Sequence, residues 1–402
     1  MSDTEAVVGT GGQKLARIRM SDWSTVVRKP PVHKVGPGTE ALECSNLSKI
    51  GLAFTALLVA SFLALLGFMP PDGKLVYALD KRYPFTAPWK SSDGRFEKFR
   101  IAAVTDLDHD TKDPNQKDTW FSYLRTGTLS LATDWSKAKV EWDQGEPHNF
   151  TSKISAGGRA MELSDLKVFD GKLLTVDDRT GIIYRLVWDE KKNQAIPWVL
   201  LNDGPGNVTK GLKGEWIAVK DDELYVGGLG KEWTTTEGVL VNHDPMWIKI
   251  VSPNGAVRHV SWVEPYKKLR AAADIYAPGY MIHESGQWSD IHQRWFFLPR
   301  RASKEMYTEK TDEHMGTNMM FIADADFKKV EMRKVTPHTP TRGFSAFQFI
   351  PGTRDEILVA LKSEEDDGKI NSFITLFDLQ GKILLPETQI EGNYKYEGIE
   401  FI

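Results

Sequence analysis

Five stretches of the chain place an acidic or hydroxyl side chain at the start of an apolar segment. They contain Ser164 and Asp165 in ELSDL, Glu215 in GEW, Glu284 in HES, Ser345 in GFSAF and Glu397 in YEGI. Successive stretches are separated by roughly 50 to 70 residues, which suits one four-stranded propeller blade with its loops. This recurrence indicates that the side chains occupy equivalent places in five repeated units.

These side chains offer only oxygen atoms as ligands. The inner strands of a propeller surround a central channel, so one such side chain per blade would converge on the channel axis. Several carboxylates brought together without a partner would repel one another. A divalent cation removes that repulsion, and a wide ring of oxygens favours Ca²⁺ over the smaller Mg²⁺. The alternative interpretation is an ordinary polar residue at the end of each strand.

Three further clusters carry groups suited to phosphate chemistry. Asp106 and Asp108 in TDLD follow an apolar strand and lie two residues apart, on one face. Arg300 and Arg301 in LPRR suit bidentate binding of phosphate oxygens, although exposed surface arginines are commoner. Asp178 in VDDRTG is better explained, from the residues alone, by a hairpin turn. Combined with calcium ligands, these residues predict a site for a phosphate ester or anhydride.

The elements that must position these groups are short strands. From residue 96 onward, apolar runs alternate with turn signals, and only residues 266–273 have a helical pattern. The segment from Gly214 to Trp233 predicts two strands joined by a tight turn and followed by a glycine-rich loop. Five repeated units predict an all-β, five-bladed propeller. Pairing of its N- and C-terminal strands would close the ring and remove the open edges.

The N-terminal part has a different composition. Residues 50–69 read IGLAFTALLVASFLALLGFM without a charge, and about 20 such residues span a bilayer as a helix. We interpret them as an uncleaved transmembrane signal anchor rather than a buried helix or a cleaved signal peptide. Residues 1–49 are then a disordered cytosolic tail, 70–95 a stalk, and 96–402 a lumenal domain. The sequons at Asn149 and Asn207 suit a lumenal domain.

Charge and cysteine content exclude several classes of protein. The net charge of −4 gives no electrostatic basis for binding DNA or RNA. The single cysteine, Cys44, precedes the apolar segment, so the folded domain has no disulfide and no cysteine-based metal site. Palmitoylation of Cys44 and an inert thiol are both compatible with its juxtamembrane place.

From about residue 100 to the C-terminus, the chain closely resembles the calcium-activated nucleotidase, or apyrase, family. The resemblance is collinear and includes AVTDLD, GRAMELSDL, VDDRTG, KGEWIAVKDDELYVGGLGKEW, LPRRAS and EGNYKYEGIEFI. It implies a five-bladed propeller with axial Ca²⁺ that hydrolyses nucleoside diphosphates, chiefly UDP and GDP and less readily ADP. It also implies a type II membrane protein of the endoplasmic reticulum and Golgi lumen, which supports glycan and proteoglycan synthesis.

The resemblance also assigns roles to individual residues. The matching motifs give the calcium-ligand roles, direct or through water, to Ser164, Asp165, Glu215, Glu284, Ser345 and Glu397. Asp106, Asp108 and Asp178 match carboxylates required for activity, Arg300 a functional arginine and Trp233 an aromatic that contacts the nucleotide. Lys231, Arg159 and Arg301 are expected to bind substrate. The expected reaction is attack of water, activated by one of the three aspartates, on the terminal phosphoryl group.

Several questions stay open at the level of sequence. The residues do not select which aspartate activates the water, the exact nucleotide preference, sequon occupancy, a calcium-dependent homodimer or cleavage in the stalk. Two other functions compete with the nucleotidase: a non-catalytic calcium-binding lumenal propeller, and a calcium propeller that hydrolyses lactones or other esters.

Overall fold

A computed structural model shows five antiparallel sheets arranged as the blades of a propeller; it describes residues 85–402, except residue 190. The inner strand of each blade contacts the inner strands of two neighbouring blades, and these contacts form a closed ring around the axis. In ring order the inner strands are β24 (Lys395–Phe401), β6 (Leu163–Phe169), β10 (Trp216–Lys220), β16 (Tyr280–Ser289) and β20 (Arg342–Phe349).

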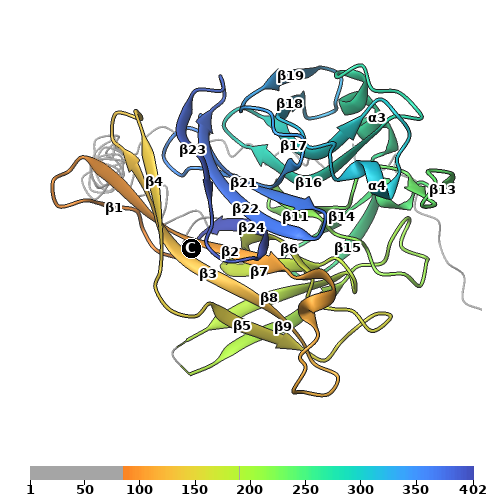
Figure 1. Cartoon of the computed structure of the whole chain (residues 1–402), viewed down its shortest axis with the longest axis horizontal. Helices are drawn as coiled ribbons and strands as arrows, with labels where there is room; N and C mark the ends of the chain where they lie inside the picture. Colours follow the sequence, from red (N-terminus) through yellow and green to blue (C-terminus); the bar gives the residue numbers. More distant parts are fainter. Residues whose placement is uncertain (1–84, 190) are drawn as a thin grey trace, which may run out of the picture. The chain divides into compact units, whose positions relative to one another are not determined.

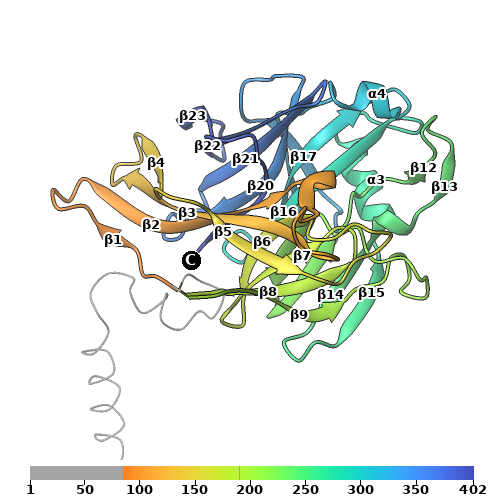
Figure 2. The ribbon, with the colours of Figure 1, turned by 60° about the horizontal axis from the view of Figure 1, so that its bottom comes forward.

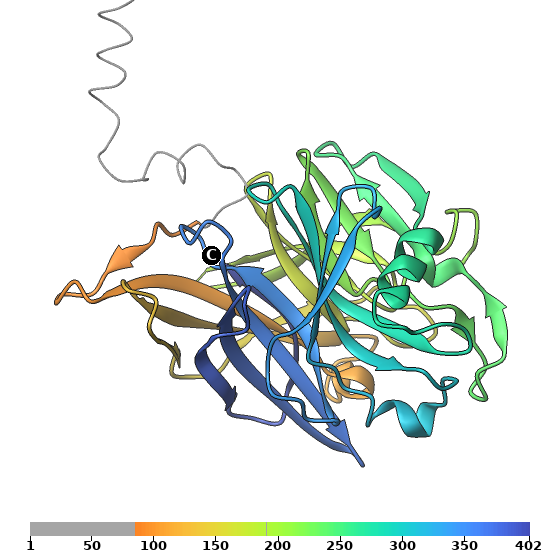
Figure 3. The same ribbon diagram turned by 90° about the horizontal axis from the view of Figure 1, so that it is seen from above.

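The first blade joins the two ends of the described chain. The last strand, β24, pairs antiparallel with β2, from Ile101 opposite Phe401 to Asp106 opposite Lys395. In Figures 1 and 3 the orange β2 therefore lies beside the blue C-terminal strands. This pairing confirms the predicted closure of a five-bladed ring. The other strands of this sheet are β1 (Trp89–Lys90), β2 (Phe96–Asp106), β3 (Trp120–Ala132), β4 (Ala138–Trp142) and β5 (His148–Ser152).

Each of the other four blades has four strands, the inner one first in sequence (Figure 2). After β6 follow β7 (Lys172–Asp177), β8 (Ile182–Trp188) and β9 (Asn193–Leu200). After β10 follow β11 (Glu223–Gly227), β14 (Trp247–Val251) and β15 (Val257–Ser261). After β16 follow β17 (Arg294–Ser303), β18 (Met319–Asp324) and β19 (Val330–Lys334). After β20 follow β21 (Ile357–Asp366), β22 (Lys369–Asp378) and β23 (Ile383–Gln389).

The remaining elements lie in connections between strands. A separate two-stranded hairpin follows β11 and consists of β12 (Trp233–Thr234) and β13 (Leu240–Asn242). The predicted helical stretch is confirmed, since α3 covers Val263–Ala271. The other helical turns are η1 (Asp108–Thr111), η2 (Asp244–Met246) and α4 (Glu309–Asp312).

Apolar side chains fill the spaces between neighbouring blades. Between the β10 and β16 blades, Trp216, Trp262, Trp295 and Phe297 form an aromatic cluster with edge-to-face ring contacts. Such pairs contribute about 0.5–1.5 kcal/mol each beyond the burial of their area. Packing of this kind holds the blades in register and so fixes the inner strands around the axis.

The N-terminal predictions fall largely outside the described residues. This applies to the tail at residues 1–49, the anchor at 50–69 and the stalk up to residue 84. Within residues 85–402, no helix has the length and apolar character needed to cross a membrane. Within the segment predicted as stalk, Trp89 and Lys90 form β1, which pairs with the start of β2. The long strand β2 itself begins at Phe96.

Candidate active site

Side-chain oxygens from four blades meet where the inner strands begin. Ser164 Oγ lies 3.5 Å from Glu215 Oε2 and 3.5 Å from Glu397 Oε2. Arg300 bridges Glu397 to Glu284, with its Nη1 donating to Glu284 at 2.6 and 2.8 Å and to Glu397 at 3.0 Å. All five of these side chains are buried. The structure therefore brings four of the six predicted calcium ligands into one cluster.

β-Bulges interrupt the inner strands of four blades beside predicted ligands. The strand register shifts at or beside the predicted ligand in β6, β16, β20 and β24. A bulge adds one residue on one strand and re-aims the side chain at that point. The close approach of β24 to β6 also requires Gly398, because a Cβ there would lie 2.6 Å from the carbonyl carbon of Asp165. Four of the five units thus share a bulge in the inner strand as well as an oxygen-bearing residue.

The axial cluster suits a calcium ion. Burial raises the pKa of Glu215 to about 8 and raises the pKa values of Glu284 and Glu397. Glu215 Oε1 has Lys213 Nζ at 2.9 Å, and Ser164 Oγ reaches Glu215 and Glu397 only at 3.5 Å. Buried carboxylates that ionise with difficulty and converge with a hydroxyl oxygen are the features a hard cation would satisfy. Ser164, Glu215, Glu284 and Glu397 would hold it.

The other two predicted calcium ligands have their side chains engaged by the backbone. The Asp165 carboxylate accepts hydrogen bonds from Leu166 N at 2.8 Å and Ile217 N at 2.7 Å. It therefore ties β6 to β10. Ser345 Oγ donates to the Tyr396 carbonyl at 2.8 Å, across β20 and β24. Both side chains connect neighbouring inner strands instead of joining the cluster formed by Ser164 and the three glutamates.

A second carboxylate cluster lies at the end of β2. Asp106 ends that strand, and its Oδ1 accepts from Asp108 N at 2.7 Å. Oxygens of Asp106, Asp108 and Glu162 all lie within 4.8 Å of one another. Lys395 Nζ lies 3.0 Å from Asp106, 2.5 Å from Asp108 and 3.4 Å from Glu397. The Lys395 ammonium therefore connects this cluster to the axial one.

The VDDRTG segment forms a turn and also contributes to the site. Asp177 makes the turn, since its carboxylate accepts from Arg179 N at 3.0 Å and Thr180 Oγ1 at 2.8 Å. Asp178 faces the site, where its Oδ2 contacts Lys213 Nζ. Its other oxygen, Oδ1, is buried and accepts no hydrogen bond. The hairpin-turn interpretation therefore applies to Asp177, and the site interpretation applies to Asp178.

Sequence reasoning missed five charged residues of the site: Glu162, Arg179, Lys213, Glu365 and Lys395. Glu162 is fully buried and accepts hydrogen bonds from Arg159 and Arg179 at 2.6 Å. Burial, together with Asp178 and Asp106, raises the pKa of Glu162 to about 7 despite these arginines. Three of the five stand two residues before a predicted ligand, the spacing that places two side chains on one face wherever a chain is extended. That period-two spacing was the available signal.

The remaining predicted substrate residues lie on the side of the β10 and β16 blades. Lys231 is buried, and its Nζ lies 4.1 Å from the centre of the Tyr307 ring. Lys231 and Tyr307 line a cavity of about 580 Å³. Trp233 is 37% exposed, and Lys210 Nζ lies 4.3 Å from the centre of its ring. Arg301 is buried and donates to the Thr341 carbonyl at 3.1 Å.

The predicted glycosylation sites are both at the surface. Asn149 is exposed on β5, an outer strand of the first blade, and Asn207 is exposed in the connection from β9 to β10. Their side chains are therefore sterically accessible for modification.

Comparison with known proteins agrees with this geometry. Residues 107–402 match the protein family described as Apyrase. The chain belongs to the apyrase family. It is 53% identical over 320 residues to the soluble calcium-activated nucleotidase 1 of Rattus norvegicus, with 80% of this chain and 77% of the relative covered. It is 52% identical to the apyrase apy-1 of Caenorhabditis elegans, covering 78% and 86%, and 43% identical to an apyrase of Cimex lectularius, covering 80% and 87%.

Proposed function

We propose that this apyrase-family chain hydrolyses nucleoside diphosphates in a calcium-dependent reaction, with UDP and GDP preferred over ADP. The products are the nucleoside monophosphate and phosphate. The observation that carries the proposal is the axial carboxylate cluster bordered by Lys213, Arg300 and Lys395. Carboxylates that can bind a metal ion, together with the positive charges of these three basic side chains, suit a diphosphate. Relatives described as calcium-activated nucleotidases support the same conclusion.

The basic side chains bind and orient the diphosphate. Arg300 is held by Glu284 and Glu397, so its guanidinium is fixed before substrate arrives. Lys213 and Lys395 stand on the β10 and β24 sides of the axis. Arg159, which lies 3.6 Å from Asp108, extends the positive charge outward. Calcium bound at the glutamates would neutralise phosphate charge. Preorganised positive groups are most effective where charge develops in the transition state.

Asp178 is the aspartate best placed to activate water. Asp106 already contacts Lys395 and the Asp108 amide, and Asp108 also contacts Lys395. Asp178 contacts Lys213 through Oδ2, whereas its Oδ1 has Arg179 Nε at 3.6 Å and accepts no hydrogen bond within the described residues. It can accept a proton from water as the water oxygen bonds to the terminal phosphorus. The bond from that phosphorus to the bridging oxygen breaks, the monophosphate leaves, and the proton passes from the carboxylate to solvent.

The remaining substrate residues contact the nucleoside. Trp233 offers an aromatic face for the base, and its chain neighbours Glu232 and Thr234 line the cavity together with Lys231. Arg301, next to Arg300, adds positive charge on the same side. This arrangement leaves the nucleoside on the β10 and β16 side of the axis and the phosphates at its centre.

We also propose a lumenal location in the endoplasmic reticulum and Golgi, with residues 50–69 as a type II anchor. The uncharged apolar segment and the exposed Asn149 and Asn207 support this topology. Hydrolysis there would remove the nucleoside diphosphate that glycosyltransferases release, and so favour glycan and proteoglycan synthesis. Protease protection of the domain in intact microsomes, with a mobility shift on glycosidase treatment, is the expected result. Digestion without detergent would contradict it.

Phosphate release tests the activity directly. The purified domain is assayed with UDP, GDP, ADP, ATP and AMP in the presence of Ca²⁺, Mg²⁺ or a chelator. We expect release from UDP and GDP with Ca²⁺ and its loss with the chelator. Calcium binding without release from any nucleotide would leave a non-catalytic propeller. Calcium-dependent cleavage confined to lactones or carboxylic esters would identify the other hydrolase.

A further inference from the structure

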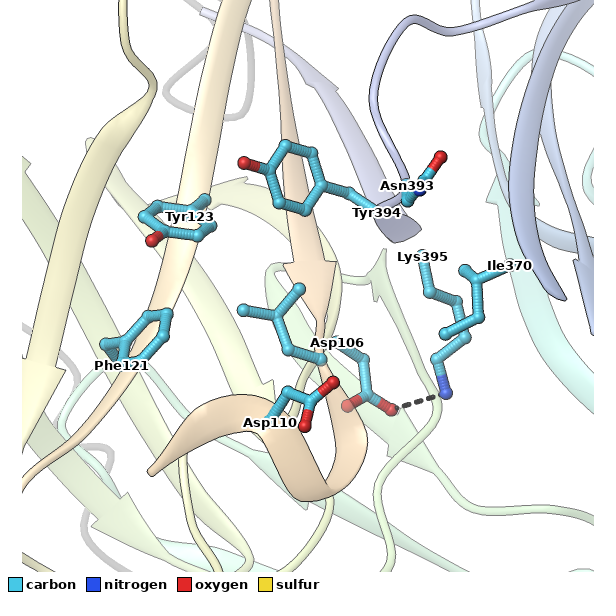
Figure 4. Close-up of a pocket in the computed structure, with 9 residues that line it drawn as sticks. Asp106, Asp110, Phe121, Tyr123, Ile370, Asn393, Tyr394 and Lys395 are labelled. Atoms are coloured by element: carbon cyan, nitrogen blue, oxygen red, sulfur yellow. Dashed lines mark ion pairs between the residues drawn. The ribbon is translucent and has the colours of Figure 1, made fainter. Parts of the chain in front are cut away.

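A second pocket opens on the other side of the catalytic carboxylates (Figure 4). It has a volume of about 230 Å³. Phe121 and Tyr123 come from β3, Tyr394 and Asn393 from the connection before β24, and Ile370 from β22. Its other lining residues are Asp106, Leu107, Asp110 and Lys395. The reaction proposed above leaves this space without a role.

Three aromatic rings form one wall of the pocket. The ring centres of Phe121 and Tyr123 are 5.2 Å apart, and those of Tyr123 and Tyr394 are 5.4 Å apart. All three side chains are only partly buried, so ring surface remains available to a ligand. Backbone contacts fix the wall, since Tyr123 N donates to Thr105 Oγ1 and the Tyr394 carbonyl accepts from Ser372 Oγ. The wall is therefore preorganised for a flat or ring-shaped group.

The opposite side of the pocket is polar. Figure 4 shows Asp106 and Asp110 below Tyr123 and Tyr394, with Lys395 and Asn393 to the right of them. Carboxylates accept hydrogen bonds from hydroxyl groups, while the C–H face of a pyranose ring packs on aromatic rings. Pockets for whole drug-sized ligands measure roughly 300–1,000 Å³, so this smaller one suits a single sugar ring. An aromatic wall facing carboxylates favours a hexosyl group.

The two cavities lie on different sides of the channel mouth. Lys231 and Tyr307 border one, between the β10 and β16 blades. The aromatic pocket lies between the first blade and the β20 blade, which are adjacent in the ring. These two blades are different from the two that border the first cavity. Arg300, Glu397 and Lys395 form a continuous ionic connection at the axis between them. A diphosphate at these cations would have one end toward each cavity.

We propose that the aromatic pocket receives a hexosyl group carried on the terminal phosphate, so that the site binds nucleoside diphosphate sugars. This inference rests on the proposed function, because it takes the diphosphate to lie at Arg300 and Lys395. A free nucleoside diphosphate leaves the pocket unfilled, whereas a sugar conjugate fills both cavities. The pocket would therefore give conjugates an affinity beyond that of the diphosphate alone.

Competition against UDP hydrolysis tests this proposal. The inhibition constant of UDP-glucose is compared with that of the β-methyl ester of UDP, which has the same diphosphate diester but no sugar ring. We expect UDP-glucose to bind about three- to tenfold more tightly, the gain that ring packing can supply. Phe121→Ala and Tyr123→Ala should bring the ratio of the two constants close to one, and Tyr123→Phe should retain it.

A matched control is Trp135→Ala, which removes an exposed aromatic side chain between β3 and β4, away from both cavities. It should keep the wild-type ratio. Equal inhibition by the two esters in the wild type would overturn the proposal, as would a ratio unchanged in folded Phe121→Ala and Tyr123→Ala. Equal weakening of UDP and its conjugates in those variants would assign the pocket to the nucleoside instead. Failure of UDP hydrolysis itself would refute the proposed function, and calorimetric binding of the two esters would then decide this inference.

Discussion

Replacing Lys395 by methionine tests how charge is organised at the axis. Lys395 is 4% exposed, and its ammonium lies within 3.5 Å of oxygens of Asp106, Asp108, Glu365 and Glu397. Methionine keeps a long unbranched side chain but removes the charge. Breaking a buried ion pair by removing one partner typically costs about 3–5 kcal/mol, because the other partner stays buried without compensation. We expect a loss of stability in this range.

The pKa of Asp106 gives a second estimate. Burial alone would raise it, but Lys395 and the Asp108 amide outweigh burial and lower it to about 2. Relative to an ordinary aspartate, this difference is worth about 2–3 kcal/mol. Because the folded-state pKa is the lower one, this stabilisation is present above the unfolded-state value of 3.8 and disappears as the pH falls toward about 2. The variant should therefore lose most stability near neutral pH.

Urea unfolding in the presence of a chelator measures this loss. It is followed by tryptophan fluorescence at about pH 7 and about pH 3.5, where the destabilisation should be smaller. Lys117→Met is the matched control, because the Lys117 side chain is 92% exposed and its nearest partner is 4.0 Å away. It should leave the unfolding free energy unchanged. A Lys395→Met variant as stable as the wild type, or a loss of equal size at both pH values, would refute the charge argument.

Three further substitutions separate the roles of neighbouring residues. Asp165→Ala should lower the unfolding free energy by about 1–3 kcal/mol with or without calcium, since Asp165 binds backbone amides. A loss of stability seen only with calcium would identify Asp165 as a calcium ligand. Asp178→Asn should lower kcat by about 10²- to 10⁴-fold without changing the half-saturating calcium concentration, and an unchanged kcat would exclude it as the group that activates water. Trp233→Ala should raise KM for UDP by about three- to tenfold and leave the inhibition constant of pyrophosphate unchanged. Equal weakening of UDP and pyrophosphate would exclude stacking on the base.

The fold was predictable because its evidence repeats. Five oxygen-bearing residues at similar spacing predicted five blades. The N-terminal strands lack an inner strand of their own, which predicted that the C-terminal strand completes the first blade and closes the ring. The structure shows this closure, since Ile101 pairs with Phe401 and Asp106 pairs with Lys395. Repetition reduces dependence on any single pattern, since each blade gives the same signal again.

The exact composition of the site was not predictable in the same way. Glu162, Lys213 and Lys395 each precede a predicted ligand by two residues, but a charged residue near a strand end is usually exposed to solvent. In the structure Glu162 and Lys395 are buried and Lys213 is partly buried, because charged partners far apart in the sequence pack around them. Asp165 was predicted as a ligand and illustrates the opposite difficulty. Its position beside Ser164 suggested a ligand, whereas the bulge in β6 turns its carboxylate toward backbone amides. A sequence motif does not reveal where a bulge reverses the direction of a side chain.

The most direct test of calcium at the axis is the calcium dependence of UDP hydrolysis in Glu215→Gln. This substitution keeps the size of the side chain and removes one negative charge from the cluster. We expect the half-saturating calcium concentration to rise by about tenfold or more, with a matching decrease in calcium affinity measured by calorimetry. A variant with wild-type calcium dependence would contradict the assignment of the axial glutamates as the calcium site.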